Sequence, residues 1–198
     1  LTAGQPLADL ARLSNTSSTP GVFEATLVAQ RATKSMLSGT TTEFWSYNND
    51  VPGPLIDVFE GDTVRIRLDN RLSQETTVHW HGLPVPPAQD GNPMDPIAPG
   101  ASRTYEFTLP VGSAGTYWYH PHPHEFTAEQ VFRGMAGLLI VRSRTDPVPT
   151  AIEEKLLVIS DLRLAADGTI PANTPRDWQN GREGNYGLVN GQYQPVLA

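Results

Sequence analysis

The segment DTVRIRLDN, residues 62–70, alternates apolar and charged side chains along its length. In an extended chain Val64, Ile66 and Leu68 project to one side, and the two arginines between them project to the other. This alternation predicts a β-strand with one face in a core and the other in water. The segment therefore belongs to a sheet that covers a core with one of its faces.

Six further segments are rich in β-branched and aromatic residues and are separated by turn-forming sequences. They are residues 22–30, 40–47, 76–82, 102–109, 115–120 and 137–141. In this part of the chain only residues 125–132 have a helical pattern. About seven strands within roughly 120 residues favour an antiparallel β-sandwich, so we expect an all-β fold.

Composition divides the chain into three parts. Residues 1–20 are polar and predict a loosely docked arm with a helical turn near residues 7–13. Residues 21–145 hold the predicted sandwich. Residues 146–198 begin as a proline-containing linker and show one clear strand pattern, at 154–164. We interpret this part as the incomplete start of a second domain. Its unpaired strand edges lead us to expect disorder, or strand pairing between molecules, after about residue 150.

The overall composition excludes several classes of function. Fourteen Lys and Arg residues against 21 Asp and Glu give a formal net charge of -7, which argues against nucleic acid or an anionic membrane as a partner. No apolar run approaches the roughly 20 residues that span a bilayer. Cysteine is absent, so disulfides, thiolate metal sites and a cysteine nucleophile are excluded. The first residue is Leu1 rather than methionine, and we expect that a preceding segment was removed.

The five histidines of the chain fall in two short segments. His79 and His81 lie two apart in TVHWHGL, and His120, His122 and His124 lie two apart in HPHPHEF. Residues two apart on a strand share a face, so each pair presents two imidazoles together. Two such pairs on separate strands, about 40 residues apart, indicate a site for Cu, Zn, Fe or Ni. The alternative is a proline-rich strand end with solvated histidines.

The prolines of the second segment restrict how its histidines can point. A residue before proline is driven out of the helical region, so His120 and His122 are held extended. If the backbone there is polyproline-like, side chains two apart diverge by roughly 120°. Neighbouring histidines would then bind different ions more easily than one shared ion. The spacing therefore predicts ligands for a cluster of metal ions.

These motifs carry a resemblance to a known family. HWHG, followed by GTYWYHPH and GMAGLLIV, resembles the N-terminal cupredoxin domain of the multicopper oxidases, which include laccases, bilirubin oxidases and bacterial cuprous oxidases. The upstream PGP and the downstream GLVNGQYQP, which resembles the opening of the family's second domain, extend the likeness from about residue 22 to the end. The resemblance implies a cupredoxin-like Greek-key β-sandwich followed by a truncated start of a second cupredoxin domain.

The resemblance also implies a ligand set. The family holds a trinuclear copper centre with eight histidines in four H-x-H pairs, two of them in the first domain. Matched by position, His79 would bind the type 2 copper, His81 and His120 one type 3 copper, and His122 the other type 3 copper. His124 would be a neighbour or a solvated residue rather than a ligand.

An aspartate in the sequence DGN has two interpretations. In similar oxidases an aspartate at the position of Asp90 lies near the cluster and helps deliver protons to reduced oxygen. Asp-Gly is also one of the commonest hairpin turns, which would give Asp90 a purely local role. The family context leads us to include Asp90 as a candidate catalytic residue.

The sequence supplies only part of such an oxidase. A type 1 copper needs a cysteine thiolate with two histidines, and this chain has no cysteine. By resemblance, the complete enzyme takes electrons singly from a reducing substrate and reduces dioxygen to water. It also needs the C-terminal cupredoxin domains that supply the other four histidines. We expect this chain alone to be inactive, and the whole enzyme to be periplasmic or secreted.

Two other functions compete with this interpretation. One is a zinc hydrolase or lyase with three histidines around an open coordination position. The other is a non-enzymatic cupredoxin-like module for copper storage or assembly, which the missing type 1 site would suit.

Overall fold

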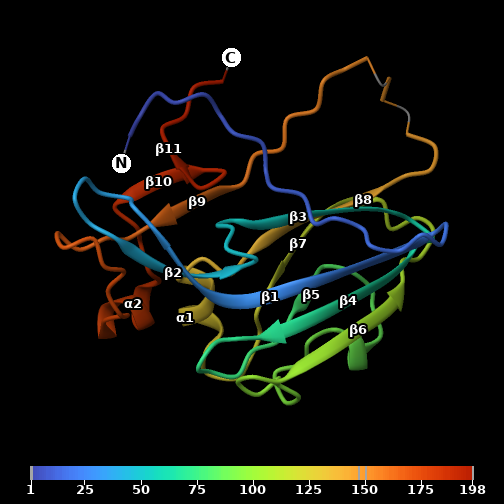
Figure 1. Ribbon diagram of the computed structural model, residues 1–198, viewed down its shortest axis with the longest axis horizontal. Coiled ribbons are helices and arrows are strands. Elements are labelled where there is room, and N and C mark those ends of the chain that lie inside the picture. The colour runs from blue at the N-terminus through green and yellow to red at the C-terminus, as the bar shows by residue number, and fades with distance from the viewer. Residues whose placement is uncertain (1, 147, 150, 198) are drawn as a thin grey trace.

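Two four-stranded sheets pack face to face, and a small three-stranded sheet with a short helix lies at one end of them (Figure 1). The computed structural model describes residues 2–146, 148–149 and 151–197, and Leu1, Pro147, Thr150 and Ala198 lie outside the described residues. The strands are β1 (Val22–Lys34), β2 (Thr42–Tyr47), β3 (Gly53–Phe59), β4 (Thr63–Asn70), β5 (His79–His81), β6 (Ser102–Thr108), β7 (Gly115–His120), β8 (Gly137–Arg142), β9 (Ile159–Leu162), β10 (Tyr186–Val189) and β11 (Gln192–Tyr193). The helices are η1 (Pro87–Gln89), α1 (Thr127–Phe132) and α2 (Pro175–Asn180).

The two large sheets mix parallel and antiparallel pairs. One has the order β2-β1-β4-β6 and the other the order β3-β8-β7-β5. The pairs β1·β4 and β3·β8 are parallel, and the remaining pairs are antiparallel. The expectation of an all-β sandwich is confirmed, but the expectation of a purely antiparallel one is wrong. Strands that are distant in sequence return beside each other in the same direction, which local alternation cannot reveal.

The core lies between the two large sheets. Val64, Ile66 and Leu68 of β4 are buried there, as their alternation predicts, while Arg65 and Arg67 face outward and pair with acidic neighbours. Large aromatic side chains, among them Trp80 and Tyr119, are fully buried in the same core. The two histidine-bearing strands therefore rest on a dense aromatic layer that fixes their backbones.

The N-terminal arm is extended rather than helical. The amide of Leu13 donates to the carbonyl of Leu55 at 2.9 Å, and the amide of Leu55 donates to the carbonyl of Ala11 at 2.7 Å. The predicted helical turn is therefore wrong. The arm pairs instead with the edge of β3, a strand that sequence analysis missed because prolines flank its start.

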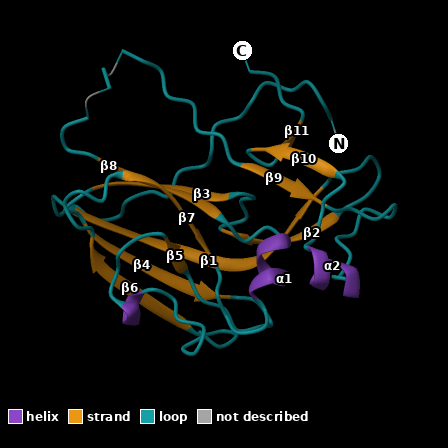
Figure 2. Cartoon of the chain, turned by 180° about the vertical axis from the view of Figure 1, so that it is seen from behind, coloured by secondary structure: helices purple, strands orange, loops and turns teal. Residues whose placement is uncertain are grey.

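The residues after 150 form a packed unit with part of the sandwich. Strands β9, β10 and β11 form one sheet. Apolar side chains of this part of the chain form one buried cluster with Met36 and with Phe44 of β2. The expectation of disorder is therefore wrong for the described residues. In Figure 2 helices α1 and α2 lie next to each other, and the guanidinium of Arg182, just after α2, stands 3.8 Å from the ring centroid of Phe132. The tail is ordered because the sandwich offers it an apolar surface.

Candidate metal centre

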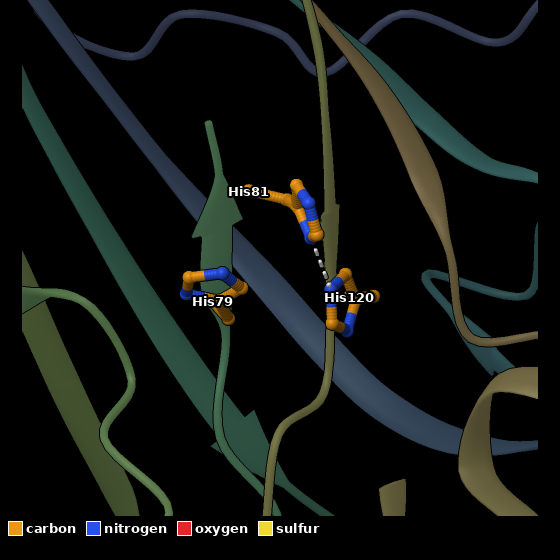
Figure 3. Close-up of side chains that lie close together, drawn as sticks. All are labelled: His79, His81 and His120. Atoms are coloured by element: carbon orange, nitrogen blue, oxygen red, sulfur yellow. Dashed lines mark hydrogen bonds between the residues drawn. The ribbon is translucent and has the colours of Figure 1, made fainter. Parts of the chain in front are cut away.

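Strands β5 and β7 bring the two histidine pairs together. They are antiparallel neighbours in a register that sets His79 opposite His120 and His81 opposite Trp118. Figure 3 shows the rings of His79, His81 and His120 gathered on one side of these two strands. One ring nitrogen from each of the three lies within 4.8 Å of the others. The register thus converts two distant H-x-H motifs into one cluster.

His81 and His120 make the closest pair in this cluster. Nδ1 of His81 lies 3.1 Å from Nε2 of His120, the contact drawn as a dashed line in Figure 3. Nδ1 of His120 lies 2.7 Å from the carbonyl of Pro121, so this nitrogen carries the proton and Nε2 offers its lone pair to the cluster. Metal–nitrogen bonds of about 2.0 Å meeting at about 100° would separate two ligand nitrogens by about 3 Å. The pair therefore fits one shared ion.

His79 is oriented by Asp90. Its Nδ1 lies 3.0 Å from Oδ1 of Asp90 and 3.1 Å from the carbonyl of the same residue. Both partners are acceptors when the carboxyl group is ionised, so Nδ1 donates and Nε2 is left free as a ligand. A carboxylate behind a ligating imidazole fixes its tautomer and raises its basicity. The structure thus brings Asp90 into contact with the cluster.

His122 lies just beyond the end of β7. The centroid of its ring is 5.4 Å from that of His79 and 6.0 Å from that of His120. Its Nδ1 is buried and has no hydrogen-bond partner within the described part of the chain. An unpartnered buried polar atom is costly unless something outside the chain satisfies it. This ring therefore lies beside His79 and His120 with an unused nitrogen, although it is not within the 4.8 Å group that the other three histidines form.

Burial keeps one of these imidazoles neutral. The buried position of His120 lowers its pKa to about 4, although its hydrogen bond to Pro121 acts in the opposite direction. The neighbouring histidine rings lower the pKa further. Transition metals bind the neutral form of imidazole, so His120 is ready to coordinate an ion at neutral pH without losing a proton.

His124 does not join the cluster. Its side chain is 71% exposed, and its Nδ1 lies 4.0 Å from a carboxylate oxygen of Glu125. This placement agrees with its predicted role as a solvated residue outside the ligand set. The difference between His122 and His124 in one HPHPH segment also provides a natural control for experiments.

A small hollow reaches the cluster from solvent. It has a volume of about 210 Å³, and its lining includes His79, Asp90 and His122. Water and small solutes can therefore approach two of the candidate ligands and the carboxylate together.

Two residues outside the predicted ligand set contact it: Trp118, which we expected to pack around the histidine strands, and Thr77, which the sequence pattern does not single out. The indole of Trp118 lies 4.2 Å from the His120 ring and 4.8 Å from the His81 ring, centroid to centroid. The buried hydroxyl of Thr77 accepts the amide proton of His122 at 2.8 Å. The pairing of β5 with β7 would have pointed to both, because it sets Trp118 beside His81 and continues toward Thr77 and His122.

Comparisons with known proteins show which family the chain is similar to. Residues 28–146 match the profile of the multicopper oxidase family. The chain is 34% identical over 188 residues to multicopper oxidase mco of Staphylococcus aureus, covering 90% of this chain and 40% of that protein. It is also 34% identical over 177 residues to cell division protein FtsP of Escherichia coli, covering 86% of this chain and 37% of that protein. A solved multicopper oxidase from Campylobacter jejuni, described as a metallo-oxidase, is 47% identical with a TM-score of 0.96 over 99% of this chain and 41% of its own.

The chain belongs to the multicopper oxidase family, which is named for oxidoreductases that use copper. The predicted cupredoxin-like sandwich and the predicted use of copper are confirmed at the level of the family. The chain spans about 40% of the length of the relatives it matches. Among the described residues, none of the helices is long and apolar enough to cross a membrane.

Proposed function

We propose that this chain supplies half of the histidine ligands of a trinuclear copper centre. In this proposal His79 binds the type 2 copper, His81 and His120 share one type 3 copper, and His122 binds the other. The observation that carries it is the 3.1 Å separation between Nδ1 of His81 and Nε2 of His120, which suits two ligands of a single ion. The free Nε2 of His79 and the unpartnered nitrogen of His122 support two further positions.

The whole protein, on this proposal, reduces dioxygen to water with electrons from a reducing substrate. Copper, when bound, supplies the one-electron chemistry and the site at which oxygen is reduced. The other four histidines and the type 1 copper come from parts of the protein outside this chain, and residues 146–198 begin the protein's second cupredoxin domain. The 40% coverage of the relatives supports this division. The chain by itself should then bind copper without oxidase turnover.

In this proposal Asp90 is a proton-transfer residue. Its carboxylate faces His79 and borders the hollow through which water reaches the cluster. A carboxylate in that position can hold a proton near the place where oxygen is reduced and can exchange it with water. An Asp90→Asn variant of the complete enzyme should lose turnover while keeping its copper content.

A copper titration with matched histidine variants tests the ligand set. The metal-free chain is titrated with Cu²⁺ and followed by electron paramagnetic resonance, in which imidazole ligands split the signal. We expect His120→Ala to weaken binding at least about tenfold, because it removes a buried ligand of the closest pair. His124→Ala serves as the control and should leave the affinity unchanged. Equal affinities in the two variants would exclude the proposed cluster.

Metal content and turnover separate the competing functions. Copper outcompetes zinc at most nitrogen sites, so competition alone is not informative. Elemental analysis of the protein from its native source is more direct: zinc without copper would support the zinc enzyme. Copper with no turnover in the complete native protein would support a non-enzymatic module. One relative is named as a cell division protein rather than as an oxidase, which keeps a non-enzymatic role in view.

A periplasmic or secreted location also belongs to this proposal. It rests on the family resemblance rather than on a feature of the described residues. Cell fractionation of the source organism would place the protein, and recovery with the cytoplasmic fraction would contradict the proposal.

A further inference from the structure

The antiparallel pairing of β5 and β7 ends between the two histidines of the second pair, His120 and His122. The register pairs His79 with His120, and its next positions set residue 78 opposite Pro121 and Thr77 opposite His122. β5 begins at His79 and β7 ends at His120, so neither of these next pairs belongs to the sheet. The amide of Val78, opposite Pro121, points away from β7 and donates to the hydroxyl of Tyr105, so the next ladder bond would have to come from the amide of His122.

A side chain replaces the missing ladder contact. The amide of His122 donates to Oγ1 of Thr77 at 2.8 Å, rather than to a backbone carbonyl of the facing segment. The carbonyl of Thr77 instead accepts the hydroxyl of Tyr47, at 3.5 Å. Thr77 is fully buried, so removing its hydroxyl would take away the acceptor that the His122 amide uses.

Helix α1 fixes the segment that carries Thr77. The side chain of Gln130 is fully buried; its Nε2 donates to the carbonyl of Glu75 at 2.8 Å, and its Oε1 accepts the hydroxyl of Thr76 at 2.7 Å. On the other side, the amide of Val78 donates to the hydroxyl of Tyr105 at 3.2 Å. The hydroxyl of Thr77 is therefore presented from a backbone that is held on both sides.

We propose that Thr77 is a positioning residue that sets the place of His122 in the metal centre. Its hydroxyl holds the His122 amide just beyond the end of the β5–β7 ladder, and this directs the His122 ring away from the ion shared by His81 and His120. The inference rests on the proposed copper centre, because it assigns His122 to a separate ion. The new element is the hydroxyl of Thr77, which acts through the backbone of a ligand rather than on the metal itself.

Three substitutions separate positioning from mere stability. Thr77→Val removes the hydroxyl at nearly constant volume, and Thr77→Ser keeps it. Thr42→Val is the matched control, because Thr42 is also fully buried and also uses its hydroxyl in a hydrogen bond, at 2.7 Å to the carbonyl of Gly168. That control removes a comparable contact in β2, outside the histidine cluster.

Copper titration of the folded chain measures the effect. We expect Thr77→Val to weaken the binding step that involves His122 about tenfold or more, as the loss of an outer partner of a ligand does. Thr77→Ser should restore binding to within about threefold of the unmodified chain, and Thr42→Val should leave it unchanged. If Thr77→Val binds copper as the unmodified chain does, or if Thr42→Val weakens binding equally, the proposal is overturned.

Amide hydrogen exchange in the unmodified chain gives a second test that does not depend on any variant folding. The His122 amide should exchange at least about a hundredfold more slowly than an unstructured amide, because a buried hydroxyl accepts it. Exchange at the unstructured rate would overturn the role of Thr77. This readout needs no metal, so it stands even if the chain fails to bind copper, a result that would instead refute the proposed function.

Discussion

Replacing Gly91 with alanine should push the loop that contains Asp90 away from β5, the strand that carries His79 and His81. Gly91 has a φ of +61°, and a Cβ built there would stand 2.0 Å from the carbonyl oxygen of Val78 and 2.9 Å from the amide nitrogen of His79. Both neighbours are backbone atoms and cannot rotate away. The loop must therefore move by about 1 Å to reach an ordinary contact of more than 3 Å.

The size of the effect follows from what the movement breaks. A left-handed backbone costs a non-glycine residue about 1 to 2 kcal/mol. The shift also strains the contact of Asp90 with His79 and the bond from Nε1 of Trp80 to the carbonyl of Gln89, which are 3.0 and 2.9 Å long. At about 1 kcal/mol for each hydrogen bond, we expect Gly91→Ala to lower the free energy of unfolding by about 3 to 4 kcal/mol.

Gly100→Ala is the control for this measurement. Gly100 has a φ of +77°, but nothing lies within 4 Å of a Cβ built there. The control should therefore show the backbone cost alone, about 1 to 2 kcal/mol. Urea unfolding of the metal-free chain, followed by tryptophan fluorescence, gives both values. Equal destabilisation by the two substitutions would refute the close approach of the Asp90 loop to β5.

Three further outcomes are expected. Burial lowers the pKa of His120 from its usual 6.5 to about 4, so the unfolded chain binds a proton at this residue more tightly than the folded chain does. The free energy of unfolding should therefore fall by up to about 3 kcal/mol as the pH is lowered from about 6.5 to about 4. An equal fall of the urea midpoint in His120→Asn would contradict this. Arg142→Met removes the 2.9 Å bond from Nε to Asp57 and should cost about 1 kcal/mol in thermal unfolding experiments, whereas an unchanged Tm would show that the pair is dispensable. Tyr119→Phe leaves the carbonyl of Pro54 without the hydroxyl that donates to it at 2.6 Å and should cost about 1 to 2 kcal/mol in urea, and a gain in stability would count against that bond.

Local sequence pattern predicted the elements that depend on local chemistry. The alternation in residues 62–70 identified β4, because side-chain direction on a strand is set by adjacent residues. The two H-x-H motifs predicted the candidate ligands for the same reason. Their convergence depends on one register, His79 with His120, which the sequence alone could not supply but the family resemblance implied.

The predictions that were wrong concern features that depend on contacts between residues far apart in the sequence. Whether the tail is ordered depends on Met36 and Phe44, which lie more than 100 residues away from their partners in β10. The direction of β3 relative to β8 depends on how the chain crosses between the sheets. The bond between Thr77 and His122 lies just beyond the end of the β5–β7 ladder, so it becomes visible only when both strands are in place.

Whether four of the five imidazoles bind copper together can be measured by nuclear magnetic resonance during a Cu⁺ titration. The chain is labelled with ¹⁵N, kept free of oxygen, and titrated with this diamagnetic ion while the ring nitrogens are followed. We expect the signals of His79, His81, His120 and His122 to shift as copper is added, while those of His124 stay in place. Shifts confined to His124, or an absence of shifts in the other four rings, would contradict it.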